Sequence, residues 1–467
     1  MCTSANTARR PLGCVGVIRL SSPTRFLRGL MRFDPCHSSR GVCAAAAVVA
    51  SILACQPDAA TSRITAPLAA SRSVVMTDRL ASPGWQEIVT TLVADGHVNP
   101  LAASRAYALL GVAQYRAVQL ARGGNDDGDD EAIRVDDETG RKGGGGGPRS
   151  RAAVRGAVAG ASVVVLSYVF PPQAQALEDT VTAQLNAATS RRAFARGEAI
   201  GRAVGAEIVT RAQGDGFNKP FTGTIPSGPG LWTSNTTPPT VAGGQMPEVL
   251  PWFLTSASQF RPPPPPAFGS QAFLTALAEI RHISDTRTAE QIRIATFWAQ
   301  NAAGVNPGEP TPPGYWVEVG TDGVDQHGLS ERQATHLYAL LGATMFDAAI
   351  GCWDGKLTYW FIRPWQADPA ITTVPAVGRP NHPSYPSAHS CFSASGAAIL
   401  SAFFPEQRER LDSLVTEAGL SRIYGGIHYR FDIEAGQQLG RSVAGFAIAA
   451  DRSGHSVLTP DEEEARR

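Results

Sequence analysis

The sequence lacks an excess of charge of either sign: 41 basic and 41 acidic residues give a formal net charge of zero. Proteins that bind nucleic acid present basic surfaces, so this balance argues against a nucleic-acid partner. Sustained alternation of apolar and polar residues is scarce as well, which argues against a fold of half-buried strands. The 467 residues are 43% hydrophobic, enough for one large core or two ordinary domains. We therefore expect an all-α protein.

Two apolar stretches resemble membrane spans, but neither fits one comfortably. The stretch 42–54 is too short to span a membrane. It follows Arg-containing segments and is followed by Cys55, a pattern typical of a signal peptide. The four residues from Ile52 to Cys55 resemble a bacterial lipobox, whose cysteine is lipidated and becomes the mature N-terminus. A plain secretory signal cleaved nearby is the alternative. Residues 151–170 carry Arg155 and are predicted to form a helix in a bundle core.

The predicted signal peptide spans residues 1–55, and a start at Met31 would give it a more ordinary length. Gln56 rather than Asp follows the cysteine, which favours the outer membrane in a bacterium with two membranes. We therefore expect an exported protein on the periplasmic face of a membrane, held there only by a lipid anchor at Cys55, or a secreted one.

Cysteine is nearly absent beyond this signal. Of the seven cysteines, four would be removed with the signal and Cys55 would be lipidated, which leaves Cys352 and Cys391. Both would lie in an oxidising compartment, where a disulfide between them is one alternative. Two buried thiols in helices rich in small residues are the expected state.

Composition and apolar spacing divide the rest of the chain. The parts are a polar tether at 56–82, an N-terminal helical region at 83–325, a C-terminal helical bundle at 326–451 and a polar tail at 452–467. Apolar residues at helical spacing predict helices within 85–121 (two, with a break at 96–100) and at 151–170, 174–212, 270–282, 288–302, 330–353, 387–404, 406–418 and 432–451. Ser284-Asp285 and Thr288 are predicted helix caps.

Three segments lack helical spacing. Residues 123–148 hold five consecutive glycines and an acidic cluster, and they are predicted to be a disordered loop. That cluster lacks the spaced D-x-D-x-D-G pattern and the closing Glu of a calcium loop. Residues 214–269 are rich in Pro, Gly and aromatics and are predicted to form a long ordered loop near a site entrance. Residues 304–325 are predicted to be another Pro/Gly loop.

Three short clusters between residues 356 and 432 carry the chemistry of the chain. Their polar members, in order, are Lys356 and Arg363, then Ser387 and His389, then Ser421, Arg422, His428 and Asp432. Five of these side chains are cationic or basic, and together they could hold one tetrahedral oxyanion.

The spacing within each cluster predicts local geometry. Lys356 and Arg363 stand seven residues apart, which predicts one helix face for both cations, with Pro364 ending or kinking that helix. Pro386 and Ser387 predict a helix entry whose free N–H groups favour an anion near the following histidine.

The third cluster combines an interruption with a histidine–carboxylate pair. Gly425 and Gly426 predict a bend in the chain between Arg422 and His428. His428 and Asp432 stand one helical turn apart, so the carboxylate can hold the imidazole in one tautomer and raise its basicity.

This constellation resembles the vanadium-dependent haloperoxidases and the type 2 phosphatidic-acid-phosphatase family of acid phosphatases, which share K-x6-RP, PSGH and SR-x5-H-x3-D. The matching residues are Lys356, Arg363, Pro364, Pro386, Ser387, His389, Ser421, Arg422, His428 and Asp432. Ala388 replaces the usual glycine; because that position contributes a backbone N–H, alanine serves if its backbone angles permit. The resemblance implies two packed helix bundles with long Pro/Gly-rich loops.

For the haloperoxidases, the resemblance implies a vanadate cofactor with His428 as its covalent protein ligand. The groups implied to neutralise its oxygens are Lys356, Arg363, Ser387, the Ala388 N–H and Arg422. Lys356 would polarise hydrogen peroxide for attack by a halide, and His389 would move its protons, giving hypohalous acid. A small organic acceptor and a homodimer are left open.

For the phosphatases, the resemblance implies other roles for the same residues. His428 would attack phosphorus, Asp432 would orient it and His389 would protonate the leaving group. Vanadate mimics the pentacoordinate transition state of that reaction, so the residues themselves fit both chemistries. A third reading, an inactive or binding lipoprotein, is disfavoured because buried cations without an anion are costly.

Features outside the clusters favour the peroxidase. About three hundred residues lie between Cys55 and Lys356, and Trp353 stands three before the lysine, as in haloperoxidases. His382 stands seven before His389, where bromoperoxidases carry His and fungal chloroperoxidases carry Phe. The 33 positions from His389 to Arg422 instead resemble the phosphatases. We predict a haloperoxidase that favours bromide or iodide, with His382 and Trp353 near the halide, and an acid phosphatase as the alternative.

Overall fold

The computed structural model describes residues 80–123, 148–299, 311–453 and 457–458, all within one compact unit. Throughout those residues the regular structure is helical, apart from one isolated bridge between Leu231 and Phe361. The prediction of an all-α fold is therefore confirmed. The predicted signal peptide and most of the tether, the glycine-rich loop and much of the polar tail lie outside the described residues.

The helices in chain order are α1 (Ala81–Asp95), α2 (Pro100–Gly123), α3 (Pro148–Val169), η1 (Pro171–Gln173), α4 (Ala174–Ala187), α5 (Arg191–Gly214), η2 (Met246–Glu248), α6 (Gln271–Thr286), α7 (Ala289–Phe297), α8 (Pro312–His327), α9 (Glu331–Tyr359), α10 (Pro364–Ala367), α11 (Ala388–Phe403), η3 (Pro405–Gln407), α12 (Arg408–Tyr424) and α13 (Arg430–Arg452).

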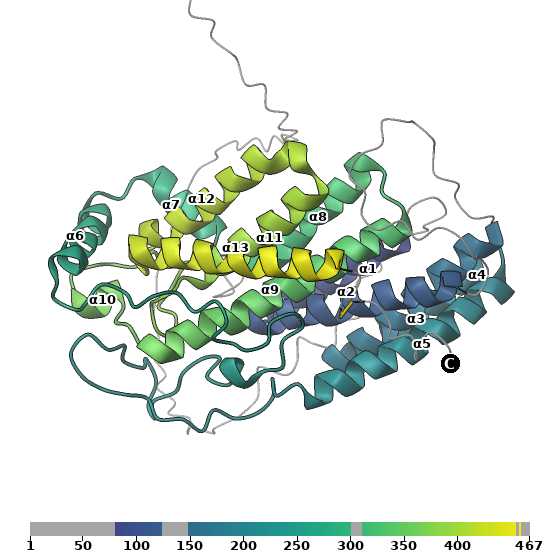
Figure 1. The fold of residues 1–467 in the computed structure, drawn as a ribbon, viewed down its shortest axis with the longest axis horizontal. Coiled ribbons are helices and arrows are strands. Elements are labelled where there is room, and N and C mark those ends of the chain that lie inside the picture. Colours follow the sequence, from purple (N-terminus) through teal and green to yellow (C-terminus); the bar gives the residue numbers. More distant parts are fainter. Residues whose placement is uncertain (1–79, 124–147, 300–310, 454–456, 459–467) are drawn as a thin grey trace, which may run out of the picture. The chain divides into compact units, whose positions relative to one another are not determined.

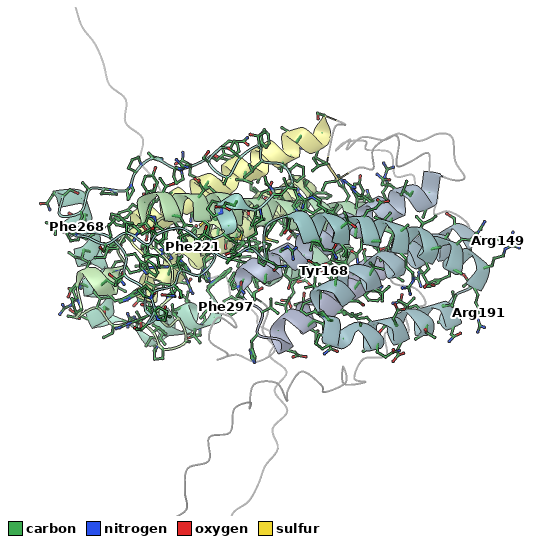
Figure 2. All side chains as sticks on the ribbon, turned by 90° about the horizontal axis from the view of Figure 1, so that it is seen from below. Arg149, Tyr168, Arg191, Phe221, Phe268 and Phe297 are labelled. Carbon is green, nitrogen blue, oxygen red and sulfur yellow. The ribbon has the colours of Figure 1, made fainter. Side chains whose placement is uncertain are left out.

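The first group of helices packs closely because glycines line its contacts. α3 and α5 lie against each other, and α2 lies against both (Figure 1). A Cβ added to Gly197 would stand 1.8 Å from the carbonyl oxygen of Ala153, so the two backbones touch. Figure 2 shows Arg149 and Arg191, near the starts of α3 and α5, at the same end of the pair. The two helices therefore run parallel, and α4 leads the chain back from the end of α3 to the start of α5.

α3 is long and apolar enough to cross a membrane over Arg149–Val169, and no other helix in the described ranges is. In this structure 61% of its most apolar 18-residue stretch is buried inside the protein, and the helix packs against α5 and α2. This burial agrees with the predicted role of the segment as a bundle-core helix.

The 29-residue α9 joins this group to the second. It packs on α2 and also on α11 and α13, which pack on each other (Figure 1). Ser330 and Gln333 form a capping box at its start, and nearly every residue from Ala334 to Lys356 is buried. A helix that is buried all round lies in the interior, so α9 carries Lys356 into the core.

Asp347 of α9 fixes the long irregular segment 214–269. Its carboxylate oxygens accept hydrogen bonds from the backbone N–H groups of Trp252, Phe253 and Leu254, at 2.8, 2.7 and 3.0 Å. Three buried N–H donors are thereby satisfied by one side chain. The segment is irregular but packed on the helices, as the sequence predicts.

The prediction of a Pro/Gly loop at 304–325 is wrong for its described part, because residues from Pro312 onward form α8. Pro312 and Pro313 occupy the first turn, where the missing N–H groups have no helical partner in any case. Gly323 is buried, and a Cβ there would stand 2.4 Å from the ring of Phe404. Close packing against neighbouring helices outweighs the low helix propensity of glycine.

The amphipathic segment predicted at 174–212 forms two helices, α4 and α5. The chain becomes extended at Ala188, and Ser190 starts α5 by accepting a hydrogen bond from the Ala193 N–H, at 3.3 Å. A single Ser at the right place therefore begins a new helix within an amphipathic stretch.

The predicted cap at Ser284-Asp285 is also wrong, since α6 continues through both residues to Thr286. Asp285 instead pairs with Arg281 one turn earlier, at 2.8 Å. Thr288 does cap α7, in a capping box with Gln291.

Candidate oxyanion site

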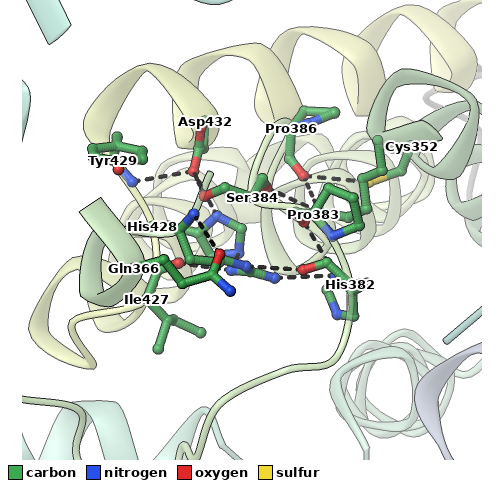
Figure 3. A network of polar contacts seen from close by, with 12 residues as sticks. Cys352, Gln366, His382, Pro383, Ser384, Pro386, Ile427, His428, Tyr429 and Asp432 are labelled. Atoms are coloured by element: carbon green, nitrogen blue, oxygen red, sulfur yellow. Dashed lines mark hydrogen bonds and ion pairs between the residues drawn. The ribbon is translucent and has the colours of Figure 1, made fainter. Parts of the chain in front are cut away.

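Three segments that are distant in sequence meet around the end of α9. They are the end of α9 with residues 360–363, the loop 382–387 that enters α11, and the turn between α12 and α13 (Figure 3). The turn forms because Gly426 adopts a φ of 74°, in the left-handed region that favours glycine. The predicted bend between Arg422 and His428 is present.

Lys356 is fully buried near the end of α9. Its ammonium group donates to the carbonyl oxygens of Pro383, Ser384 and Pro386, at 2.9, 3.0 and 2.5 Å. An ammonium group has three N–H donors, so all three are engaged. Lys356 therefore orders the loop that leads to Ser387 and adds a buried positive charge to this region.

Arg363 is also fully buried, but it does not lie on the helix that carries Lys356. α9 ends at Tyr359 because Trp360 takes a left-handed φ of 47°. Arg363 follows in extended backbone, and Pro364 begins α10. The prediction of one helix face for both cations is therefore wrong, although both side chains reach the loop 382–386.

The guanidinium group of Arg363 links the loop to the turn. Its Nε donates to the carbonyl oxygen of His382 at 3.0 Å, and its Nη1 donates to that of Ile427 at 2.6 Å. Nη1 also lies 3.0 Å from Nε2 of His428.

His428 is 2% exposed and is held at both ring nitrogens. Nδ1 lies 2.8 Å from Oδ2 of Asp432, and Nε2 faces Nη1 of Arg363. A carboxylate only accepts and a guanidinium only donates, which assigns the proton to Nδ1 and the lone pair to Nε2. The Ser384 hydroxyl donates to the same carboxylate oxygen at 2.6 Å. The expected contact between His428 and Asp432 is present.

α11 presents its N-terminus to this region. Ser387 is the residue before the helix, and its Oγ is buried without a hydrogen bond within the described ranges. The first N–H groups of a helix also lack helical partners, and they attract anions. Ala388 has the helical conformation that alanine adopts freely, so it presents a backbone N–H without strain in place of the usual glycine.

Arg422, in the last turn of α12, is the third buried cation. Its Nε donates to Oγ of Ser421 at 2.8 Å, and its Nη2 donates to the carbonyl oxygen of Ala295 at 3.1 Å. The other guanidinium N–H groups have no partner in the described part of the chain and are available to an anion.

Three more predicted residues lie near these cations. His389 is half-buried in the first turn of α11, with Nε2 at 2.8 Å from the carbonyl oxygen of Trp298. His382 accepts a hydrogen bond at Nδ1 from Nη2 of Arg363, at 3.0 Å, and its ring centre lies 5.1 Å from that of Trp353. The Trp353 ring centre is 5.6 Å from Nζ of Lys356.

Burial dominates the electrostatics of the site. It lowers the pKa of Lys356 to about 8, that of Arg422 to about 9 and that of Arg363 to about 10. None of the three forms an ion pair with a carboxylate among the described residues. Unpaired buried charges are strongly unfavourable, so three cations gathered here indicate a site for an anion.

The histidine–carboxylate pair carries no net positive charge at neutral pH. Burial, then the charges of Arg363 and Lys356, hold the pKa of His428 well below its usual value. Burial raises the pKa of Asp432 to about 6, although the Ser384 hydroxyl opposes that change. His428 is therefore neutral near pH 7, with its Nε2 lone pair directed at Nη1 of Arg363.

The two cysteines of the described chain are buried next to the site. Cys352 and Cys391 are free and buried, as the sequence predicts. The Sγ of Cys352 is 3.8 Å from the carbonyl oxygen of Pro386, which also accepts from Lys356.

The affinity for an oxyanion should fall as the pH rises through 8. Burial lowers the pKa of Lys356 to about 8 in the empty site, and above that pH the ammonium group loses its charge. Tungstate suits the measurement because its own charge does not change in this range. We expect its affinity to fall by up to about tenfold per pH unit above pH 8. Lys356→Met should bind tungstate more weakly at pH 7, and its affinity should change little as the pH rises through 8. A variant whose affinity falls as steeply as that of the wild type would show that a group other than Lys356 causes the dependence.

A family model matches the part of the chain that contains all three clusters. The match is to the PAP2 superfamily and covers residues 334–452. Residues 334–452 form a PAP2-superfamily domain. This PAP2 domain runs from the first turn of α9 to the end of α13, and the prediction of membership in this superfamily is confirmed.

The chain is similar to known proteins of two kinds. A non-specific acid phosphatase of Providencia stuartii is 28% identical over 190 residues, which cover 40% of this chain and 71% of the phosphatase. The fold is similar to that of a bacterial vanadium-dependent iodoperoxidase, with a TM-score of 0.64 and 23% identity over 80% of this chain and 96% of that one. It is also similar to a bacterial vanadium-dependent chloroperoxidase in its holo form, with a TM-score of 0.59 and 14% identity. This match covers 82% of this chain and 98% of the chloroperoxidase chain. These structures share the helical fold, which extends well beyond the PAP2 domain.

Sequence patterns did not point to three contributors to the site. Ser384 holds Asp432, and backbone carbonyl groups of Ala295 and Trp298 accept from Arg422 and His389. A backbone carbonyl has no sequence signature, so only the fold reveals the last two. Ser384 stands in the second cluster, but nothing in its spacing pairs it with an aspartate 48 residues later.

Proposed function

We propose that this protein is a vanadate-dependent haloperoxidase that oxidises bromide or iodide with hydrogen peroxide to hypohalous acid. One observation carries the proposal: three buried cations, none paired with a carboxylate among the described residues, gather near a neutral histidine whose Nε2 lone pair faces one of them, Arg363. The similarity to the iodoperoxidase supports the peroxidase reading, since it covers 80% of the chain and includes helices outside the PAP2 domain.

The donor set fits vanadate. A tetrahedral oxyanion presents only acceptors. Arg422 and the α11 N-terminus present N–H donors, while Lys356 and Arg363 add positive charge. The Ser387 hydroxyl, which is buried and makes no hydrogen bond to any described residue, adds one more. Bound vanadate would supply a Lewis acid that activates hydrogen peroxide toward a halide without changing its own oxidation state.

Each residue of the site then has a defined role. His428 would offer Nε2 as a ligand, while Asp432 holds the proton on Nδ1. His389 would take and return protons of the peroxide. His382 and Trp353 border the cations and would contact the halide.

An acid phosphatase is the second candidate, favoured by the Providencia stuartii relative and by the 33 positions between His389 and Arg422. In that reaction Nε2 of His428 would form a bond to phosphorus as the P–O bond to the leaving group breaks. The leaving oxygen would take a proton from His389, and water would then hydrolyse the phosphohistidine.

Parallel assays of one preparation separate the two functions. After loading with orthovanadate, the protein should consume peroxide only when bromide or iodide is present. Without vanadate, it should hydrolyse p-nitrophenyl phosphate slowly or not at all. Phosphate release that vanadate inhibits, with no halide oxidation, would contradict the proposal and favour the phosphatase.

We also propose export of the protein with a lipid anchor at Cys55, on the strength of the lipobox-like sequence before it. Metabolic labelling with a radioactive fatty acid should mark the wild type and leave Cys55→Ala unlabelled. Equal labelling of both would refute the anchor.

A further inference from the structure

A chain of contacts outside the three clusters ends at His389. Nε2 of His389, on α11, donates to the backbone carbonyl oxygen of Trp298, just after α7, at 2.8 Å. The indole N–H of Trp298 donates in turn to Oε1 of Glu417 on α12, at 2.9 Å. Trp298 is fully buried and Glu417 is half-buried.

We propose that Trp298 and Glu417 are positioning residues for His389, which hold its Nε2–H and leave Nδ1 as the nitrogen that exchanges protons with the substrate. The inference rests on the proposed function, in that His389 moves protons there. It concerns the step in which His389 accepts a proton at Nδ1; as a proton donor in the phosphatase reaction, His389 would first have to be protonated there.

The carbonyl group of Trp298 is well placed for this task because its residue is fixed on several sides. The Trp298 N–H bonds to the carbonyl oxygen of Ile294, which ties it to the end of α7. Its ring packs edge-on against Phe297 and Tyr315, with ring centres 5.5 and 5.0 Å away. The bond to Glu417 then fixes the rotation of the indole, so the carbonyl group keeps its direction.

The same turn also contacts a second member of the site. The carbonyl oxygen of Ala295, one turn before Trp298, accepts from Nη2 of Arg422. The end of α7 therefore orients two site residues that come from different clusters. A displacement of α7 would move both.

The hydrogen bond determines which nitrogen of His389 is active. A carbonyl oxygen only accepts, so Nε2 carries a proton, and in the neutral ring Nδ1 is then the acceptor. Burial, and then the charge of Arg422, hold the pKa of His389 well below its usual value, while the Trp298 carbonyl group opposes that change. A neutral imidazole with one fixed tautomer is suited to accept a proton at a defined atom.

Removal of the indole N–H tests the proposal, with a control for the loss of ring volume that accompanies it. Trp298→Phe keeps an aromatic ring but lacks that donor, and we expect kcat to fall about tenfold with KM changed little, because small misplacements of a proton-transfer group lower turnover. Glu417→Gln keeps an acceptor and should retain the wild-type kcat, whereas Glu417→Leu should match Trp298→Phe. The double variant should be no slower than either single one, since both break the same contact.

Trp316→Phe is the matched control. It removes another buried indole N–H from the same aromatic cluster, one that donates to Oγ of Ser393 at 3.2 Å and not to Glu417. We expect a comparable loss of stability but an unchanged kcat and pH–rate profile. Identical kcat and pH profiles in Trp298→Phe and Trp316→Phe would overturn the positioning role.

The tautomer of His389 gives a readout that needs neither vanadate nor activity. Nitrogen-15 NMR of the metal-free protein should show the Nε2–H tautomer in the wild type and in Trp316→Phe, and a mixture of tautomers in Trp298→Phe. An unchanged Nε2–H tautomer in Trp298→Phe would contradict the inference. A wild type without halide oxidation or phosphatase activity would refute the proposed function instead, while this spectrum still decides the positioning.

Discussion

His428→Ala should abolish turnover, with kcat/KM at least about 10³-fold below the wild type under either chemistry. The substitution removes the Nε2 lone pair that would bind vanadium or attack phosphorus. It also leaves Asp432 without the Nδ1–H that it accepts at 2.8 Å. Bromide-dependent peroxide consumption and p-nitrophenyl phosphate hydrolysis, each measured per folded protein, check the expectation.

His336→Ala is the control for this variant. His336, also in the PAP2 domain, pairs with a carboxylate through Nε2, at 3.0 Å from both oxygens of Asp451, and stacks on Tyr115. Its removal should lower stability by about 1 kcal/mol and leave turnover unchanged. Turnover retained in His428→Ala would exclude His428 as ligand or nucleophile and remove the basis for both functions.

Gly197→Val should strongly destabilise the protein, lowering the free energy of unfolding by about 3 kcal/mol. A Cβ at this position would stand 1.8 Å from the carbonyl oxygen of Ala153 on α3, far inside van der Waals contact. Gly156 meets the backbone of α5 in the same way, with a Cβ 2.0 Å from the carbonyl oxygen of Phe194. The two helices would have to separate along their length.

Chemical denaturation measures this effect, and Gly445→Ala provides the opposite case. Gly445 lies on the exposed face of α13, where a Cβ would meet nothing within 4 Å. That substitution should stabilise the protein by about 0.5 kcal/mol, since it only reduces the freedom of the unfolded chain. A Gly197→Val variant as stable as the wild type would show that α3 and α5 are not in direct backbone contact.

The candidate site could be predicted from sequence because its chemistry depends on side-chain type and spacing. Lys356, Arg363, His389, Arg422 and His428 were all identified in this way, and the structure brings them together. Their backbone setting was less predictable. A spacing of seven suits a helix, but the left-handed Trp360 ends α9 before Arg363, and nothing in the local sequence required that turn.

The fold, too, was predictable where the sequence carries a local pattern and unpredictable where tertiary contacts decide. Long helices with regular apolar spacing, such as α2 and α9, were predicted because their burial leaves a periodic pattern. α8 was not predicted because its prolines and glycines have low helix propensity; its packing against α11, α9, α2 and α1 stabilises it. Tertiary contacts of that kind have no local signal.

The PAP2 domain illustrates why fold alone does not determine the reaction. The same buried cations and the same His428–Asp432 pair suit a vanadate cofactor and a phosphoryl transition state equally. What both functions require is the binding of one oxyanion by these residues, so this binding is the central claim about the site.

Calorimetric titration of the purified protein with orthovanadate tests that claim most directly. We predict saturable binding of one vanadate per chain, competition by phosphate, and an affinity lowered by about tenfold or more in Arg363→Met, which removes charge-assisted hydrogen bonds while keeping much of the side-chain volume. Absence of saturable binding, or equal affinity in wild type and Arg363→Met, would contradict the account.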